Sequence, residues 1–588
     1  MRRHLLIILL IAFIARAVLL ASNTVSFHSD EAVVALMARH ILQGERPVFF
    51  YGQAYMGSLD AWLVAIGFQL LGESVLTIRF VQAFLYLLIV ATGYLFAWRV
   101  SGRPIIAAVT GLILALPPVL FALYTTATLG GYNEMLLCGN LVLLFGYEVA
   151  GAHRRSWWRW AALGLAAGIG WWANGLIIAF ALPVGLYILW QFVRSLTPPP
   201  APPRIQGGEQ TESPSLPSPR WRGIRVGGAG LMLLLGILIA AAFFVIGSAA
   251  WWGFNFANDF APLRFYLVGG ERGEFAGTDI PPLPFPERIL GLIFLGLPAV
   301  FGLRFPWSPV YVLPVLGVGV LLIYLLAIVR LARAPQSLRS EPHAPTPLTA
   351  SVGAGQVPPT VEASLAPTQN SEVPDARPLV LGMIGLFCVL FVASRFSIDP
   401  TGRYFLPVIL PLAVVLGTLI DALWVRRRVV AVALITVVLG YNLIGQVTAA
   451  SNNPPGFTTQ FNLDTHIPNT WDAELIAFLD EHELYHGYTN YWVSFRLAFL
   501  SGDRMQYSAA LSYKPDLSYT PADDRYLPYV QATEAADRIA YITANVAEVK
   551  AWLEAQFAAR GVTYQSAQVG VYHIYYDFTP EAPRPPFD

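Results

Sequence analysis

The first polar stretch inside the sequence reads Phe27-His28-Ser29-Asp30-Glu31-Ala32, and it follows an apolar run from Leu5 to Ser22. An apolar run of about 18 residues is long enough to cross a bilayer as a helix. The charged start Met1-Arg2-Arg3-His4 favours a cytoplasmic N-terminus, because basic residues remain on the cytoplasmic side. Asp30 and Glu31 are therefore expected on the outer face, directly after the first transmembrane helix.

The composition supports a membrane protein. The chain has 588 residues, of which 55% are hydrophobic and 13% are charged, whereas soluble proteins carry about 25% charged residues. The formal net charge is zero, which excludes a basic nucleic-acid binder, so we expect no nucleic-acid partner. Eleven apolar segments are predicted to span the membrane: 5–22, 75–98, 104–124, 133–150, 158–173, 174–193, 227–249, 308–330, 378–397, 403–424 and 429–449.

The positions of the arginines set the sidedness of these spans. With the N-terminus inside, the cytoplasmic connections are the basic ones, and the last of them contains Arg426-Arg427-Arg428. A twelfth apolar segment, 288–303, would turn this triplet outward if it crossed, so we predict that it is re-entrant or interfacial. Two cytoplasmic linkers, about 195–226 and 331–377, are rich in proline and small residues and are expected to be disordered.

The composition changes at about Ser451, where long apolar runs stop and polar residues return. We therefore divide the chain into a transmembrane module, 1–450, and an extracytoplasmic domain, 451–588. The pattern of the second part indicates a small α/β domain. Its helices are predicted at 471–483 and 546–560, and its strands at 538–543 and 570–577.

The loop that carries Asp30, residues 23–74, is too long for a simple connection. Its pattern predicts two helices, Ala32–Leu42 and 58–72, that lie on the membrane surface. The acidic pair has two compatible interpretations. Ser29 can cap the first helix, so that both acids stabilise its first turn. Alternatively, a carboxylate at the membrane boundary, its pKa raised by partial loss of water, can act as a general base.

Other polar residues fall in the outer connections. Glu134 begins an apolar span, where an acid is either stabilised by the helix dipole or functional. Trp172 can belong to an aromatic belt at the membrane surface. Arg395 and Arg403 lie outside against the positive-inside tendency, so they either extend toward lipid headgroups or bind an anion such as a lipid phosphate. His28 has no second histidine at ligand spacing, and the sequence leaves a divalent metal open.

These features together resemble a known family. The chain is similar to GT-C-fold membrane glycosyltransferases of the protein mannosyltransferase and aminoarabinose transferase type. The similarity rests on Asp30-Glu31 with the two helices of that loop, on Gly131-Tyr132-Asn133-Glu134, on Arg403-Tyr404-Phe405-Leu406-Pro407, and on the stretch from Tyr488 to Leu497. The first outer loop has no lysine, although family members often carry one there.

The resemblance implies a polytopic GT-C fold of about eleven transmembrane helices with a C-terminal extracytoplasmic α/β domain. It implies transfer of a sugar from a polyprenyl-phosphate donor in the membrane lipid to a glycan, lipid or protein acceptor. Asp30 would be the general base, and Glu31 would orient it or bind the acceptor. A phosphate leaving group needs cations rather than a second acid, and a single displacement inverts the anomeric centre. Substrate contacts are expected from Gln53, Tyr55, Asn133, Glu134, Trp172, Asn174, Arg264, Arg395, Arg403 and Tyr404.

Two other classes of function remain open on the sequence. A transporter or lipid-linked-sugar flippase would carry ionisable residues near the middle of the membrane. An inactive scaffold that presents the outer domain would tolerate loss of the whole candidate site. The predicted spans carry few charged residues away from the candidate site, among them Arg16, Arg79, Glu148 and Asp421, which lie mostly near span ends.

Overall fold

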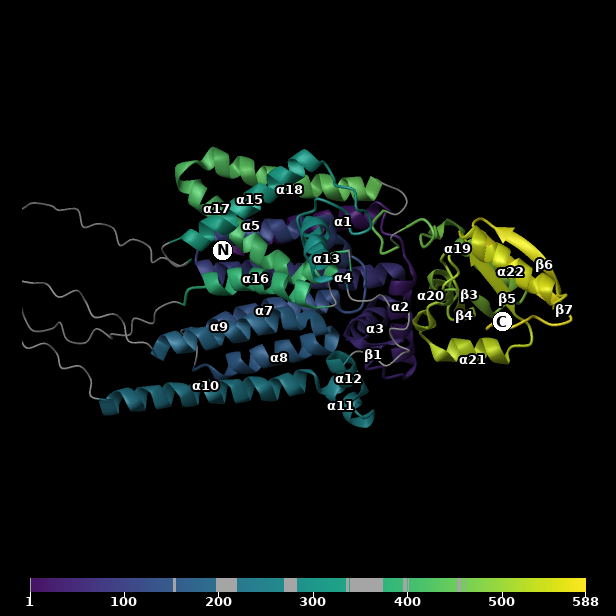
Figure 1. The fold of residues 1–588 in the computed structure, drawn as a ribbon, viewed down its shortest axis with the longest axis horizontal. Helices are drawn as coiled ribbons and strands as arrows, with labels where there is room; N and C mark the ends of the chain where they lie inside the picture. The colour runs from purple at the N-terminus through teal and green to yellow at the C-terminus, as the bar shows by residue number, and fades with distance from the viewer. Residues whose placement is uncertain are drawn as a thin grey trace, which may run out of the picture.

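A bundle of long helices and a C-terminal α/β domain lie end to end in the computed structural model (Figure 1). The domain sits at the end of the bundle where α1 ends and α2 begins (Figure 1). The structure describes residues 2–151, 155–196, 219–268, 283–334, 338, 374–394, 399, 401–451, 456–460 and 462–587.

Every predicted transmembrane segment contains a helix. Seven of the described helices are long and apolar enough to cross a membrane, and the other predicted spans hold shorter or more polar helices. The polytopic helical architecture is thereby confirmed. The bundle consists of α1 (Arg2–Ala21), α4 (Val75–Ser101), α5 (Pro104–Ala115), α6 (Val119–Tyr124), α7 (Tyr132–Ala150), α8 (Trp157–Ala173), η1 (Gly175–Ile177), α9 (Ile178–Leu196), α10 (Pro219–Gly247), α15 (Pro314–Arg333), α16 (Arg377–Ala393), η4 (Arg403–Val408), α17 (Ile409–Arg426) and α18 (Arg428–Ser451).

The predicted span 104–124 is interrupted at Pro117 and the proline after it, because proline cannot continue the helical hydrogen-bond ladder. Side chains of other helices bind the carbonyl groups that the break releases. The Tyr86 hydroxyl of α4 donates to two of them at 2.8 and 2.9 Å. Asn442 Nδ2 of α18 donates to the Leu116 carbonyl oxygen at 2.9 Å. The interruption thus ties three helices together and leaves α6 as a separate helix.

The two predicted linkers fall largely outside the described residues. The first is shorter than expected, because α10 begins at Pro219 rather than at 227. The second begins after α15, which ends at Arg333, and α16 starts again at Arg377. The expected disorder therefore concerns residues that the structure does not describe.

The twelfth apolar segment forms one short helical run that ends before the chain turns back toward α15. The buried Arg304 holds this turn, because its guanidinium donates to three carbonyl groups at 2.9 to 3.0 Å. Its place relative to a membrane, re-entrant or interfacial, stays a prediction. The run consists of α13 (Phe285–Gly291), a π-helical turn η2 (Leu292–Gly296) and α14 (Leu297–Val300).

The first outer loop folds into the two predicted helices, with a small hairpin between them. The predicted cap is wrong, because α2 begins at Ser29 itself, with His28 at the N-cap position. The Ser29 hydroxyl is buried and has no hydrogen-bond partner among the described residues. The loop contains α2 (Ser29–Gln43), β1 (Phe49–Phe50), β2 (Gln53–Gly57) and α3 (Leu59–Leu71).

The C-terminal domain is a mixed five-stranded sheet with helices, as the sequence predicted. The strand order is β4-β3-β5-β7-β6; β3 runs parallel to both of its neighbours, and β7 runs antiparallel to both of its own. The domain contains α19 (Asp472–Glu481), β3 (His486–Asn490), α20 (Tyr491–Leu500), β4 (Gln506–Leu511), α21 (Leu527–Ala535), β5 (Ala540–Ala544), α22 (Ala547–Ala559), β6 (Thr563–Val569) and β7 (Tyr572–Thr579).

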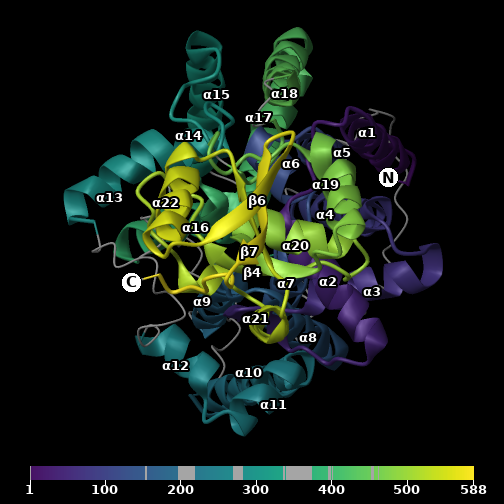
Figure 2. The same cartoon turned by 90° about the vertical axis from the view of Figure 1, so that its right-hand side faces the viewer.

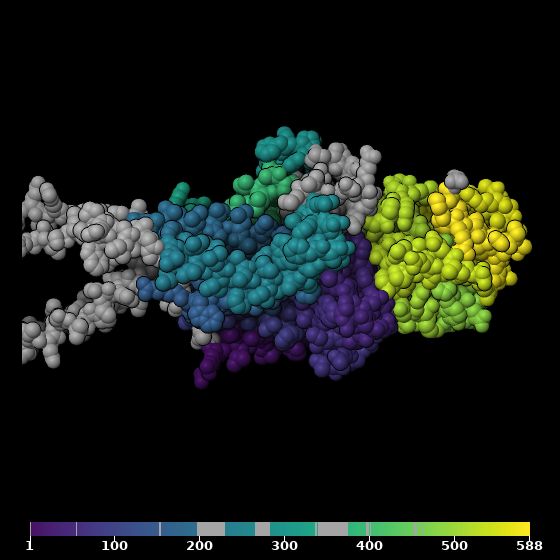
Figure 3. Space-filling view, turned by 90° about the horizontal axis from the view of Figure 1, so that it is seen from below, coloured from purple at the N-terminus to yellow at the C-terminus, as the bar shows by residue number. Residues whose placement is uncertain are grey.

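The domain docks on the first outer loop. Helix α20 packs on α2, and the end-on view shows the domain in front of the bundle (Figure 2). In the space-filling view, the first outer loop lies directly against the domain (Figure 3). Residues of α2, α3 and the C-terminal domain share one buried hydrophobic cluster, so the loop and the domain form a common core.

Candidate active site between the bundle and the C-terminal domain

Asp30 lies in the first turn of α2, where the bundle meets the C-terminal domain. Its two carboxylate oxygens each accept a hydrogen bond from that domain's side. The Tyr491 hydroxyl donates to Oδ1 at 2.5 Å, and the Thr459 hydroxyl donates to Oδ2 at 2.8 Å. The side chain keeps 23% of its surface exposed, so Asp30 is held in place and still open to solvent.

The environment lowers the pKa of Asp30. Burial alone would raise it, but His28, Arg525 and the hydroxyls of Tyr491 and Thr459 outweigh burial. Burial lowers the pKa of His28 to about 4, so His28 is neutral at pH 7, and Arg525 and the two hydroxyls are the contacts that stabilise the Asp30 charge at that pH. The expected raised pKa is therefore wrong for Asp30, which is ionised and ready to accept a proton at neutral pH.

Glu31 points away from solvent into the bundle. Its carboxylate binds Arg79 of α4 at 2.5 Å and accepts a hydrogen bond from the Thr128 backbone N–H at 3.2 Å. It is fully buried, and burial raises its pKa to about 7 against the effect of Arg79. The residue thus joins α2 to α4 and to the loop before α7, which fixes the helix that carries Asp30.

Asp60 in the first turn of α3 is a second buried carboxylate, which the sequence analysis missed. Its Oδ2 accepts hydrogen bonds from the backbone N–H groups of Gly130 and Gly131 at 3.2 and 3.1 Å, and from the Thr128 hydroxyl at 3.3 Å. Burial raises its pKa to about 6. The sequence carried a signal for this residue. Asp60 is the second residue of an outer helix, after Ser58 at the N-cap, just as Asp30 is the second residue of α2, after His28 at the N-cap.

Glycines allow this region to pack closely. A Cβ on Gly57 would lie 1.7 Å from the Trp172 carbonyl oxygen, and one on Gly131 would lie 2.6 Å from the Ala173 carbonyl oxygen. Gly131 also has a φ of +78°, which disfavours other residues. The hairpin of the first outer loop and the loop before α7 therefore both rest on the end of α8.

The acid and the amide that begin α7 are both buried. Glu134 interacts electrostatically with Asp60, and its Oε1 has no hydrogen-bond partner among the described residues. Asn133 Nδ2 donates to Gln82 Oε1 at 2.6 Å, and its own Oδ1 is without a described partner. The structure therefore places Glu134 near the buried carboxylate of Asp60 rather than beside that of Asp30.

The predicted residues at the end of α8 have structural partners. Trp172 Nε1 donates to the Val48 carbonyl oxygen at 2.9 Å. Asn174 caps η1 by accepting from the Leu176 N–H at 3.0 Å, and its amide donates to the Gly130 carbonyl oxygen at 3.3 Å. Both residues therefore hold the loops around the site in place.

Gln53 and Tyr55 belong to β2, beside the site. Gln53 is half-buried, and its Oε1 has no hydrogen-bond partner among the described residues. Tyr55 lies in the same strand, but its side chain is outside the described part of the chain. Arg264 is exposed on α12 (Ala261–Val268), which packs beside β2.

Arg403 stands at the start of η4 and forms an ion pair with Asp399 at 2.5 Å. Its guanidinium also lies 5.2 Å from the centre of the Tyr404 ring, and 38% of its side-chain surface is exposed. Tyr124 at the end of α6 lies within electrostatic range of both Arg403 and Asp30. Arg395 lies outside the described residues.

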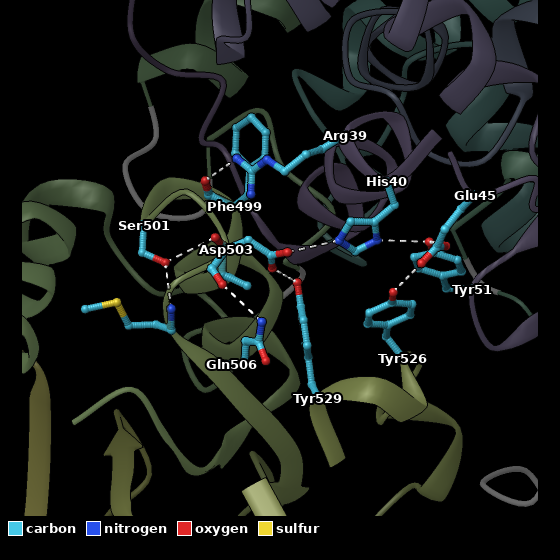
Figure 4. Close-up of polar contacts among 12 residues, drawn as sticks. Arg39, His40, Glu45, Tyr51, Phe499, Ser501, Asp503, Gln506, Tyr526 and Tyr529 are labelled. Carbon is cyan, nitrogen blue, oxygen red and sulfur yellow. Dashed lines mark hydrogen bonds and ion pairs between the residues drawn. The ribbon is translucent and has the colours of Figure 1, made fainter. Parts of the chain in front are cut away.

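The second half of α2 is tied to the C-terminal domain by a buried polar cluster (Figure 4). Arg39 Nη2 donates to the Phe499 carbonyl oxygen at 2.8 Å. His40 Nε2 lies 3.2 Å from Asp503 Oδ2, and the Tyr529 hydroxyl donates to Asp503 Oδ1. Together with the contacts of Asp30, this cluster clamps both ends of α2 to the domain.

A pair of stacked tyrosines extends the same contact toward solvent. The rings of Tyr51 and Tyr526 are 4.5 Å apart, and both hydroxyls donate to the Glu45 carboxylate, at 2.5 and 2.6 Å. One tyrosine comes from the hairpin loop and the other from the domain. Glu45 thus bridges the two parts of the chain.

We expect Asp503→Asn to loosen the docking of the domain by about 1–3 kcal/mol, since it weakens two partly buried hydrogen bonds. His40 and Tyr529 outweigh burial and lower the pKa of Asp503. The stabilisation is therefore present above the unfolded pKa of about 4 and disappears as the pH falls through the lower folded value.

Thermal unfolding and limited proteolysis at pH 7 and at about pH 3.5 measure the effect of Asp503→Asn and the effect of pH. Asp577→Asn, which removes an exposed pair with Arg538, is the control; equal stability of both variants would contradict the expectation.

No group of three or more His, Cys, Asp or Glu side chains that could hold a metal ion occurs among the described residues.

Residues 58–199 match the family described as dolichyl-phosphate-mannose-protein mannosyltransferase. The ArnT structure from Cupriavidus metallidurans, bound to undecaprenyl phosphate, is similar over 98% of this chain and 99% of that chain, with 13% identity and a TM-score of 0.54. The chain has the GT-C fold. A structure of the archaeal oligosaccharyltransferase AglB from Archaeoglobus fulgidus is also similar, over 92% of this chain and 69% of that chain, with 12% identity and a TM-score of 0.47. A search of curated protein sequences finds no match.

The family match covers residues 58–199, and the fold similarity extends over nearly the whole chain. The matched segment begins at Ser58, so it includes Asp60, Glu134 and Asn174 but not Asp30. The structure brings Asp30 to the same end of the bundle, where α2, α3 and α7 meet.

Proposed function

We propose that this protein transfers a sugar from a polyprenyl-phosphate donor to a hydroxyl or amine of an acceptor on the outer face of the cell membrane, with inversion. The observation that supports it most is the setting of Asp30. This carboxylate is ionised, fixed by two hydroxyl donors and partly exposed, at the end of a GT-C bundle. The acceptor is a glycan, a lipid or a protein.

The reaction needs one base and one cationic contact. Asp30 accepts the proton of the attacking acceptor group as that group forms a bond to the anomeric carbon. The bond between this carbon and the phosphate oxygen breaks at the same time, and polyprenyl phosphate leaves with the electron pair. Because phosphate is stable as an anion, the leaving group needs no proton donor.

Arg403 is the proposed phosphate contact. Its Nε faces Asp399 and its Nη2 donates to the Tyr404 hydroxyl at 3.4 Å, but the guanidinium has five N–H donors and is partly exposed, so it can also bind a phosphate. The exposed Arg264 beside β2 is the second candidate. Glu134, Gln53 and Tyr404 are proposed to surround the sugar.

The charges of Arg16, Arg79, Glu148 and Asp421 favour transfer over transport, because each of these four residues has a partner near a helix end. Arg16 donates to the Ala122 carbonyl oxygen and to the Thr125 hydroxyl. Arg79, Glu148 and Asp421 each belong to an ion pair, with Glu31, Arg99 and Arg103 respectively. We propose that the Arg99–Glu148 end is cytoplasmic and that the domain end is extracytoplasmic.

Mass spectrometry of lipid that copurifies with the protein tests the donor class. We expect polyprenyl phosphate or its sugar form, and its loss by about 10-fold or more in Arg403→Ala, since a charge-assisted contact contributes about 1.5–3 kcal/mol. Arg426→Ala, an exposed arginine at the other end of α17, is the matched control. Absence of such a lipid, or equal retention by both variants, would overturn the donor assignment.

A further inference from the structure

Building on the proposed function, we propose that the C-terminal domain completes the catalytic centre, with Tyr491 and Thr459 as the positioning residues of the Asp30 base. The two residues lie 461 and 429 positions away from Asp30 along the chain. Neither is part of the transmembrane module that ends with α18. The base therefore reaches its working arrangement only when the domain is docked.

The two hydrogen bonds leave room for the acceptor. A carboxylate has about four lone-pair positions, and the two hydroxyls occupy one on each oxygen. The remaining positions, on a side chain that is 23% exposed, can receive the proton of an acceptor hydroxyl. The two donors thus fix the orientation of the carboxylate without blocking its reaction.

The position of the Tyr491 hydroxyl is itself fixed. Asn490 caps α20 by accepting a hydrogen bond from the Trp492 N–H at 3.0 Å, which sets Tyr491 as the first residue of that helix. The guanidinium of Arg525 lies 4.6 Å from the centre of the Tyr491 ring. The aromatic side chain is fully within the common core of the first outer loop and the domain.

The helices α2 and α20 are aligned along their length. Asp30 at the start of α2 meets Tyr491 at the start of α20, and Arg39 near the end of α2 meets Phe499 near the end of α20. The cluster of Figure 4 holds the far ends together. A shift of the domain would consequently move the hydroxyl away from the base.

A hydroxyl that donates to a carboxylate stabilises its charged form. Removing the Tyr491 donor should therefore make Asp30 easier to protonate. The other charged or titratable groups that face Asp30 come from the loops before α2 and α21, from α2 itself, from the loop after β4 and from α6. They are His28, Glu31, Tyr124, Tyr513, Asp523 and Arg525.

The test is the pH dependence of kcat/KM for sugar transfer by the full-length protein. We expect Tyr491→Phe to move the acidic limb upward by about one pH unit, because one of two donors to the carboxylate is lost. Transfer below the limb then falls about 10-fold, while the plateau above it is largely kept. Thr459→Val should shift the limb in the same direction. Tyr575→Phe and Thr489→Val, whose hydroxyls donate to Glu554 and to the Ile542 carbonyl oxygen, are the matched controls.

An unchanged limb in Tyr491→Phe and Thr459→Val would overturn the proposal, and so would an equal loss of activity at all pH values. Failure of the proposed function has a different signature. In that case the wild-type protein releases no polyprenyl phosphate, or Asp30→Asn transfers sugar at the wild-type rate. The two inferences are thus tested separately by one set of variants.

Discussion

Asp30→Asn is expected to lower kcat for sugar transfer by about 100- to 10,000-fold, the range that general-base catalysis contributes. Asparagine has nearly the same shape, and its single amide oxygen can still accept from one of the two hydroxyls, but it cannot take a proton from the acceptor. KM should change little, because the substituted atom acts on the proton that moves in the transition state. The measurement is steady-state transfer from a labelled polyprenyl-phosphate sugar.

The matched control is Asp537→Asn, at an exposed aspartate of the same domain as Tyr491. Both variants should be produced and folded like the wild type. If Asp30→Asn kept full activity at a normal amount of folded protein, Asp30 would not be the base.

Arg79→Met is expected to destabilise the protein by about 3–5 kcal/mol, the usual cost of leaving one partner of a buried ion pair without the other. Glu31 is fully buried, and Arg79 is its cationic partner. Thermal unfolding in detergent measures the effect, which should also appear as a lower yield of folded protein.

The double variant Glu31→Gln/Arg79→Met distinguishes a lost charge partner from lost packing. It removes the uncompensated charge and keeps an acceptor for the Thr128 N–H, so it should be more stable than Arg79→Met alone. A double variant as unstable as the single one would show that the ion pair is not the source of stability.

The membrane architecture could be predicted from the sequence because it depends on local patterns. Apolar length located each transmembrane helix, and Pro117 with the proline after it divided one predicted span into two helices. The pattern of the first outer loop also predicted α2 and α3. The position of each of these helices thus depended on residues that are close together in the chain.

The site depended on contacts that are distant in the chain. Asp30 was found from its position before a helix, but the direction of its pKa was not, because Tyr491 and Thr459 approach it from the C-terminal domain. Asp60 carried the same local signal as Asp30 and was overlooked. Glu31 was expected to orient Asp30 or to bind the acceptor. Its burial against Arg79 could not be predicted from neighbouring residues, because Arg79 lies 48 positions away in the chain.

The most direct test of glycosyl transfer is the fate of the lipid-linked sugar in proteoliposomes that contain the purified protein. With a labelled polyprenyl-phosphate sugar and an acceptor mixture, we expect one polyprenyl phosphate to be released for each sugar transferred, with an inverted anomeric centre, and neither product with Asp30→Asn. If instead the donor crossed the bilayer intact, with no cleavage of the bond between sugar and phosphate, the protein would be a transporter and the assignment would be contradicted.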